Sequence, residues 1–274
     1  MAEAFGAFRE FELAGWANVD VVLGYHEQIS VVTVQVSGPL LDAAGVQNGA
    51  RVLDVATGAG YVAAAAKIRR AIPVGLDFSP AQVALARKTS ESIRFEVADA
   101  EVLPFEDGEF DAVVCAFGMC HFPNPGAAVQ EAARVLKSGG RFAFAVWDTP
   151  DRAVGFGAIN AAIGEHGARP TDLPPGPDFF RFSTPAESLK TLEDAGFVSL
   201  KFQHVPQLWR LADADQLYTA ITGGSVRAAA TIQAQTQAAR EEIRRAIKGS
   251  VESWKVGDHY EIPMPAVVAS GVKP

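Results

Sequence analysis

The stretch RVLDVATGAGYVA, residues 51–63, passes from an apolar run through two glycines into a helix-like segment. Its last part, GAGYVA from Gly58, matches the G-x-G-x-x-G/A pattern with which dinucleotide-binding folds turn from a strand into a helix. Gly58 and Gly60 allow unusual φ angles and a close approach of the backbone to a ligand. Because the following helix presents free N–H groups at its N-terminus, we predict a cofactor-binding loop here.

Apolar runs and helix-like segments alternate along the chain after this stretch. The runs are apolar on both faces, which is typical of strands that helices cover on both sides. Ser79, Pro80 and Gln82 provide an N-cap, a proline at N1 and a capping-box partner for one of the intervening helices. The alternation predicts an α/β fold, a doubly wound and mostly parallel sheet. The further strand candidates are residues 72–77, 93–98, 110–117 and 141–147.

Three other segments differ from this alternation. Residues 1–40 are rich in aromatic side chains and are predicted to form a helical lid. Residues 148–183 are rich in proline, and residues 206–256 contain one apolar helical stripe, so both are predicted to be cap insertions. We therefore expect a single domain over residues 1–274. The Ala- and Gln-rich helix within 206–256 has two open roles, covering a pocket or forming a homodimer contact.

Composition excludes several classes of protein. The chain has 49% hydrophobic and 20% charged residues, which is an ordinary globular balance. Its formal net charge of −8 argues against nucleic acid as a partner. We expect no secretory signal and no membrane span, because no apolar run is long enough. Cys115 and Cys120 form no disulfide framework or zinc pattern, so we predict no metal site and a reducing, cytoplasmic location.

Asp54 decides which cofactor the loop suits. In a dinucleotide site a glycine directly follows the strand and lets the pyrophosphate approach, but here the strand ends with a carboxylate. Two like charges about 4 Å apart cost on the order of 4 kcal/mol at an effective dielectric constant near 20. S-adenosylmethionine carries an ammonium and a sulfonium group and no phosphate. Asp54 therefore favours S-adenosylmethionine over NAD.

Two more acidic positions follow the next strands. Asp77 ends the second strand, where its carboxylate suits ribose hydroxyls; this need is common to NAD and S-adenosylmethionine. The neighbouring Phe78 is a candidate for packing on the adenine face. Asp99 and Ala100 follow the third strand, where a carboxylate can accept from the adenine amino group. We also assign Phe117, at the end of the fourth strand, to the cofactor site.

Several segments in the right order resemble the motifs of class I S-adenosylmethionine-dependent methyltransferases. They are VLDVATGAG, GLDFSPAQ, FEVADAEVLPFEDGEFDAVVCAF and EAARVLKSGGRF, over roughly residues 45–147. The chain is most similar to the ubiquinone/menaquinone biosynthesis C-methyltransferases, which tend to carry alanine where other members have the first motif glycine, as Ala56 here. The resemblance implies a Rossmann-like sheet of seven strands with the last one antiparallel. Residues 197–205 and 262–274 are then the sixth strand and the seventh, edge strand.

The resemblance also assigns the cofactor contacts. It implies that Asp54 and the loop 56–60, with Ala56, Thr57, Gly58 and Gly60, hold the methionine moiety. It assigns Asp77 to the ribose and Asp99 with Ala100 to the adenine. The cofactor would be S-adenosylmethionine and its product S-adenosylhomocysteine.

The acceptor side is less defined by sequence. His121 follows the fourth strand and is the candidate general base, although a histidine there can also serve only to shape the pocket. Trp16, Tyr25, Met119 and Trp147 are candidates for an apolar acceptor pocket, which suggests a small, partly apolar molecule. Carbon, oxygen and nitrogen remain open as acceptor atoms. The alternatives are an NAD(P)-dependent oxidoreductase and a protein that binds S-adenosylmethionine without transferring methyl.

Overall fold

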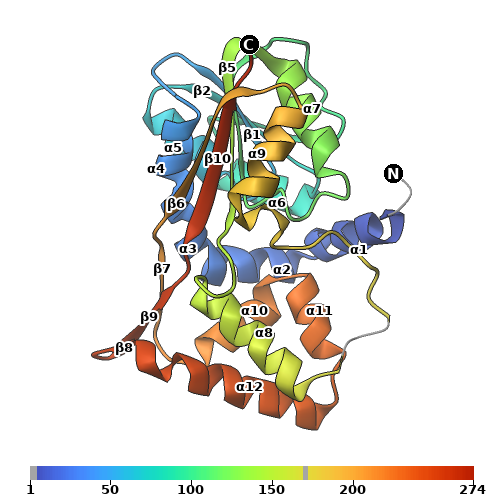
Figure 1. Ribbon diagram of the computed structural model, residues 1–274, viewed down its shortest axis with the longest axis vertical. Helices are drawn as coiled ribbons and strands as arrows, with labels where there is room; N and C mark the ends of the chain where they lie inside the picture. Colours follow the sequence, from blue (N-terminus) through green and yellow to red (C-terminus); the bar gives the residue numbers. More distant parts are fainter. Residues whose placement is uncertain (1–4, 169–171) are drawn as a thin grey trace.

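The computed structural model describes residues 5–168 and 172–274 and centres on a seven-stranded sheet in the order β3-β2-β1-β4-β5-β10-β6 (Figure 1). β1 pairs in parallel with β2 and β4, β2 with β3, and β4 with β5. β10 runs antiparallel to both β5 and β6. The predicted fold class, a mostly parallel sheet with an antiparallel last strand, is confirmed. The strands are β1 (Arg51–Val55), β2 (Ile72–Asp77), β3 (Arg94–Val97), β4 (Phe110–Ala116), β5 (Leu136–Trp147), β6 (Val198–Val205) and β10 (Ala266–Val272).

The last strand does not form the edge of the sheet, so this expectation from sequence is wrong. β10 inserts between β5 and β6, and β6 is the edge strand. The side chains explain the order: β10 reads AVVASGV and is buried over nearly its whole length, as a central strand requires. β6 carries Lys201, Gln203 and His204 and leaves most of its residues exposed, which suits an edge that must not pair with other chains.

Helices cover both faces of the sheet (Figure 1). Side chains alternate along β1, so that Val52 packs with α4 and α5 while Leu53 packs with α7 on the other face. The Ser79 hydroxyl accepts from the N–H of Gln82 at 3.2 Å, so the predicted N-cap of α6 is present. The flanking helices are α4 (Ser37–Ala43), α5 (Tyr61–Ile68), α6 (Pro80–Thr89), α7 (Pro125–Val135) and α9 (Pro185–Asp194).

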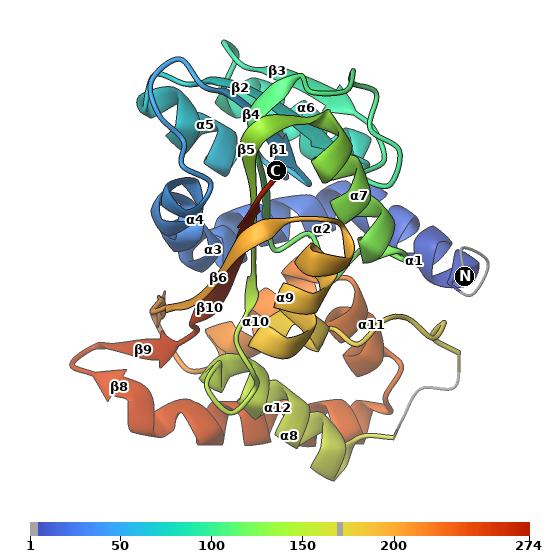
Figure 2. The same cartoon turned by 45° about the horizontal axis from the view of Figure 1, so that its top comes forward.

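A second layer lies beyond the carboxyl ends of the parallel strands, and the N-terminal helices run between the sheet and this layer (Figures 1 and 2). Two chain segments link the sheet to the cap: β6 of the sheet is followed by β7 of the cap, and β9 of the cap is followed by β10 of the sheet. The N-terminal elements are α1 (Gly6–Ala17), α2 (Val19–Gly24), η1 (Tyr25–Ile29), α3 (Ser30–Thr33) and η2 (Val34–Val36). The cap contains α8 (Val154–His166), η3 (Arg181–Ser183), β7 (Leu208–Leu211), α10 (Gln216–Gly224), α11 (Arg227–Gln233), α12 (Gln237–Val251), η4 (Glu252–Trp254), β8 (Lys255–Val256) and β9 (His259–Pro263).

The segments predicted as lid and cap gather on this side of the molecule; within them, residues 1–4 and 169–171 lie outside the described residues. The apolar stripe of α12, Ile243, Ile247 and Val251, is buried in the same core as residues of α8. The stripe is therefore covered within the chain, and a homodimer would need another surface. Over residues 5–168 and 172–274 no helix has the length and hydropathy to cross a bilayer.

Candidate functional site

The loop between β1 and α5 has an unusual backbone. Gly58 and Gly60 have φ angles of 56° and 84°, and Ala56 has a φ of 54°. A left-handed conformation is disfavoured for alanine, so the surrounding structure must hold Ala56 in place. A side chain at position 60 would meet the Phe95 ring at 2.7 Å, which adds a packing reason for this glycine. The loop therefore has the conformation that its glycines predict.

Asp54 lies behind this loop. It is 1% exposed, and its Oδ2 accepts from the Thr57 hydroxyl at 2.6 Å and from the Ala63 N–H at 3.0 Å. Oδ1 has no hydrogen-bond partner among the residues that the structure describes. Burial raises the pKa of Asp54 to about 7, although the two hydrogen bonds lower it. One oxygen thus fixes the loop against the first turn of α5, and the other is buried and unsatisfied.

Asp77 connects the loop to the end of β2. Its Oδ2 accepts from the N–H of Gly58 and its Oδ1 from the N–H of Ser79, each at 2.9 Å. The carboxyl group is buried, and burial raises its pKa to about 6 against the opposing effect of these hydrogen bonds. Asp77 and Phe78 both line a cavity next to the loop.

Asp99 is engaged by the N-terminal helix. Its Oδ2 forms an ion pair with Arg9 of α1, and its Oδ1 accepts from the N–H of Glu101 at 2.9 Å. Arg9 also pairs with the Glu101 carboxylate. Ala100 is buried in the core that packs against α7. Sequence reasoning missed Arg9, whose partners lie about 90 positions away in the chain.

The cavity has a volume of about 380 Å³ and lies between the carboxyl ends of the strands and the cap. It brings together predicted cofactor and acceptor residues, namely Trp16, Tyr25, Ala56, Gly58, Asp77, Phe78, Phe117, His121 and Trp147. Cap residues complete the lining, among them Phe156, Phe179, Phe180, Trp209 and Arg227. The predicted residues outside the lining are Asp54, Thr57, Gly60, Asp99, Ala100 and Met119.

Met119 is the acceptor-pocket candidate that the structure places elsewhere. Its side chain is 1% exposed and packs in the core on the α7 side of the sheet, together with Phe122. The neighbouring Phe117, with a φ of 58°, instead lines the cavity and packs on Trp147 with ring centroids 4.3 Å apart. The turn after β4 therefore divides its side chains between core and cavity, a choice that the local sequence does not reveal.

His121 faces a buried carboxylate that sequence reasoning also missed. Its Nδ1 is 2.9 Å from Oε2 of Glu12, and the Trp16 Nε1–H donates to the same oxygen at 3.0 Å. Glu12 is 3% exposed and lines the cavity. The sequence does carry a signal for Glu12. Phe8, Glu12 and Trp16 are spaced four residues apart, so all three lie on the buried face of α1.

The protonation of the two polar rings in the cavity differs from that in water. Burial lowers the pKa of His121, but Cys120 and Glu12 beside it have the larger combined effect and raise it well above 6.5. Burial raises the pKa of Tyr25 to about 12, and its hydroxyl donates to Thr33 at 3.4 Å. At neutral pH the free protein therefore holds a protonated His121 next to the Glu12 carboxylate and a neutral Tyr25.

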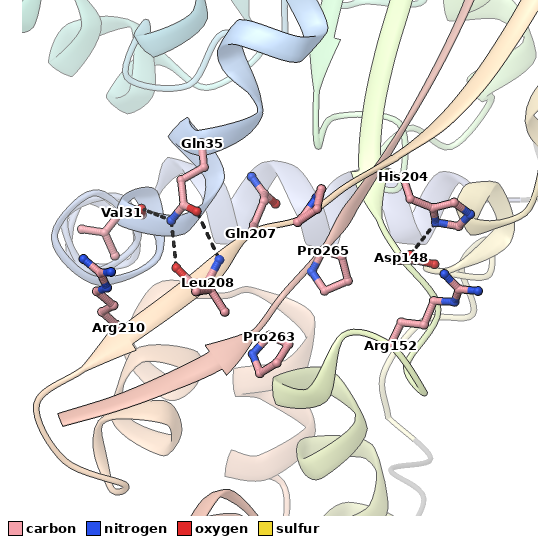
Figure 3. A pocket seen from close by; sticks show the side chains of 11 residues that line it. Val31, Gln35, Asp148, Arg152, His204, Gln207, Leu208, Arg210, Pro263 and Pro265 are labelled. Carbon is pink, nitrogen blue, oxygen red and sulfur yellow. Dashed lines mark hydrogen bonds and ion pairs between the residues drawn. The ribbon is translucent and has the colours of Figure 1, made fainter. Parts of the chain in front are cut away.

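A second cavity, of about 1100 Å³, lies between α3, β7 and the loop after β5 (Figure 3). Here the buried Asp148 carboxylate is 2.7 Å from Nδ1 of His204, with Arg152 nearby (Figure 3). The Gln35 amide exchanges hydrogen bonds with the backbone of Leu208 and so ties η2 to β7. The two cavities share no lining residue. No cluster of three or more potential metal ligands occurs in the described ranges.

Comparison with known proteins identifies the central part of the chain. Residues 53–144 match a family described as a methyltransferase domain. A demethylmenaquinone methyltransferase of Thermus thermophilus is 43% identical over 115 residues, which cover 40% of this chain and 52% of the relative. The chain carries a class I S-adenosylmethionine-dependent methyltransferase domain. The sequence resemblance to this family is thereby confirmed.

Other comparisons extend over more of the methyltransferase fold. An uncharacterized protein of Mycobacterium tuberculosis is 34% identical over 170 residues, or 59% of this chain and 58% of the relative. The chain thus spans between half and three fifths of the length of these curated relatives. The structure of a putative methyltransferase from Bacillus halodurans superposes with a TM-score of 0.56 at 24% identity, covering 87% of this chain and 98% of that one. This likeness supports the fold.

Proposed function

We propose that this protein transfers a methyl group from S-adenosylmethionine to a small, partly apolar acceptor bound in the cavity. The observation that carries the proposal is a pair of buried carboxylates in β1 and β2: Asp77 lines the apolar cavity, and Asp54 lies behind the loop that borders it. No Lys or Arg forms an ion pair with either of them within the described residues.

The chemistry of this donor set fits the proposed cofactor. Oδ1 of Asp54 is a buried acceptor without a donor, which suits a ligand with a cationic or hydrogen-bond-donating group. Asp77 lines the cavity and can accept from hydroxyl groups. A pyrophosphate at the loop would instead be repelled by Asp54, whereas Asp77 suits the ribose of either cofactor. We therefore assign Asp54 and the loop 56–60 to the methionine moiety and Asp77 with Phe78 to the nucleoside.

Asp99 can contact the adenine only if its ion pair with Arg9 changes. Its carboxylate pairs with Arg9 in this structure, so contact with an adenine amino group requires Arg9 to share or release it. Helix α1 also contributes Phe8, Glu12 and Trp16 to the cavity lining. We infer that α1 closes over the cofactor and that the Arg9 ion pairs hold it in the closed position.

The acceptor is proposed to be a small molecule because of how the cavity is enclosed. α1 and η1 cover one side and cap elements α8, α10 and α11 another, and all contribute lining side chains. The cofactor supplies an activated methyl on a sulfonium sulfur. This chain's aromatic lining excludes water and aligns the acceptor, which favours a displacement that consumes charge. Two partner predictions are untested: that the protein does not bind nucleic acid, and that it can form a homodimer.

Methyl transfer can be tested directly with S-adenosylmethionine labelled on the methyl group and a panel of small phenols, amines and activated carbon acids. We expect label in an organic product with the wild-type protein, and about tenfold less with Asp77→Asn, because one charged hydrogen bond is lost. Asp20→Asn, an exposed change on α2, serves as the matched control. Cofactor binding without label transfer to any acceptor would support the alternative of a binding protein.

A further inference from the structure

The pair formed by Glu12 and His121 is built into the cavity from two distant parts of the chain. Glu12 lies on α1, and His121 follows β4. The Glu12 Oε2 holds both the His121 Nδ1 and the Trp16 Nε1 at about hydrogen-bond distance, 2.9 and 3.0 Å. No Lys or Arg pairs with Glu12 within residues 5–168 and 172–274, so the imidazole is its cationic partner. A buried carboxylate without this partner would be costly.

This contact fixes the orientation of the imidazole. Because Nδ1 is held by Glu12, Nε2 is the nitrogen assigned to a ligand, with the Cys120 thiol as a second hydrogen-bond partner of the ring. The ring is further held by Trp16 and Phe179, in edge-on contacts with centroids 5.4 and 6.1 Å apart. His121 itself lines the cavity. The arrangement is that of a positioned cationic hydrogen-bond donor, with its orientation determined by a second residue.

The rest of the neighbourhood favours an aromatic acceptor. Trp147, Phe156, Phe179 and Phe180 form successive ring contacts along one wall, with centroid separations of 5.0–5.7 Å. The titratable groups around His121 are Glu12, Cys120, Asp77 and Tyr25, and all of them line the same cavity. Only Glu12 and Asp77 among these are carboxylates, so the imidazole lies in an acidic and aromatic environment.

We propose that Glu12 positions His121 to bind the ionisable hydroxyl of an aromatic acceptor, and that the enzyme methylates this oxygen. The inference rests on the proposed function and names its substrate class. A phenolic hydroxyl, with a pKa near 10 as in tyrosine, can ionise next to a protonated histidine, whereas an aliphatic alcohol is far less acidic. Glu12 acts through His121 and is a positioning residue.

The step balances without any further reactant. The hydroxyl proton is lost to solvent as the acceptor binds, and the phenolate oxygen accepts from the Nε2–H of the protonated His121, which the Glu12 carboxylate stabilises. A lone pair of the phenolate oxygen forms the bond to the methyl carbon, while the carbon–sulfur bond breaks and leaves its electron pair on sulfur. The phenolate and sulfonium charges cancel, giving a neutral ether and a thioether. His121 keeps its proton throughout, paired with Glu12.

The test uses 4-nitrophenol as the probe, because its phenolate is coloured and its ionisation can be read without turnover. We would titrate it with pH in the presence of excess full-length protein, with and without S-adenosylhomocysteine. We expect the pKa of bound 4-nitrophenol to fall by about one unit or more, a tenfold stabilisation of the phenolate. His121→Gln and Glu12→Gln should remove most of this shift, and Glu12→Asp should restore part of it.

A matched control is Glu10→Gln, the same substitution at an exposed position of the same helix, which should leave the shift unchanged. Nuclear magnetic resonance of His121 gives a second readout, since its pKa should fall in Glu12→Gln even if the ring stays in place. A His121 signal with a lowered pKa shows that the Glu12→Gln protein is folded and has lost only the contact that positions the ring.

Two results would overturn the inference while leaving the proposed function intact. One is an unshifted pKa of bound 4-nitrophenol, or no binding of it, in a protein that binds S-adenosylhomocysteine normally. The other is an equal shift in wild type, His121→Gln and Glu12→Gln. Failure of the proposed function would look different, because the wild-type protein would then show no calorimetric binding of S-adenosylhomocysteine.

Discussion

Asp54→Asn should stabilise the free protein and weaken cofactor binding. The Asp54 carboxyl has a usual pKa of 3.8 and a folded pKa of about 7, because it is buried with one oxygen unsatisfied. At about pH 8 it is ionised in both states, and the shift corresponds to a penalty of about 4 kcal/mol at about 1.4 kcal/mol per unit. Asparagine removes this charge and can still accept from Thr57 and Ala63 through its carbonyl oxygen.

The sign of the pH dependence follows from the raised pKa. Below about pH 3 Asp54 is protonated in both states and costs nothing, and the stability of the wild type falls as pH rises from the unfolded pKa of 3.8 through the folded pKa. Asp54→Asn should therefore match the wild type at low pH and gain up to about 4 kcal/mol near pH 8, which is roughly 5–15 °C in Tm for a chain of this size.

The assay combines thermal unfolding at about pH 5 and pH 8 with calorimetric titration of S-adenosylhomocysteine. The ammonium group of the ligand should bind at least about tenfold more weakly to Asp54→Asn, since a charged hydrogen bond is lost. Asp20→Asn is the exposed control and should change the free energy of unfolding by less than about 0.5 kcal/mol at either pH. Equal destabilisation of Asp54→Asn at both pH values, with unchanged affinity, would refute the reasoning.

Two further substitutions test the loop and the lid. Ala56→Gly should raise the free energy of unfolding by about 1 kcal/mol in chemical denaturation, because Ala56 has a φ of 54° and glycine adopts this conformation without strain. Ala50→Gly, at a position without a positive φ, should instead destabilise, and the same sign for both would contradict the explanation. Arg9→Ala should change stability by less than about 1 kcal/mol, since its ion pairs are partly exposed, yet speed hydrogen exchange over Gly6–Ala17. Unchanged exchange there would show that Arg9 does not hold α1 closed.

The features that could be predicted from sequence are those determined by neighbouring residues. The β1–α5 loop follows from an apolar run, two glycines and the helix after them, and the N-cap at Ser79 follows from its own local motif. Asp77 lies next to the loop because parallel strands bring their carboxyl ends to one edge. The fold class was also predictable, because alternating strands and helices form a mostly parallel sheet covered by helices.

The features that escaped prediction depend on contacts between distant segments. Glu12 and Arg9 reach their partners across about 90–110 positions, so no local pattern marks them. The place of β10 between β5 and β6 follows only from comparing two strands that lie far apart in the sequence, the apolar β10 and the more polar β6. Met119 points into the core and Phe117 into the cavity because the backbone turns sharply after β4.

The central claim is that the buried carboxylate of Asp54, in β1, makes this a site for S-adenosylmethionine and not for a dinucleotide, while Asp77 at the end of β2 holds the ribose. Isothermal titration of the wild-type protein with S-adenosylhomocysteine and, separately, with NADH tests it most directly. We predict saturable binding of S-adenosylhomocysteine, weakened about tenfold by Asp77→Asn, and no binding of NADH. Saturable binding of NADH without binding of S-adenosylhomocysteine would contradict the account.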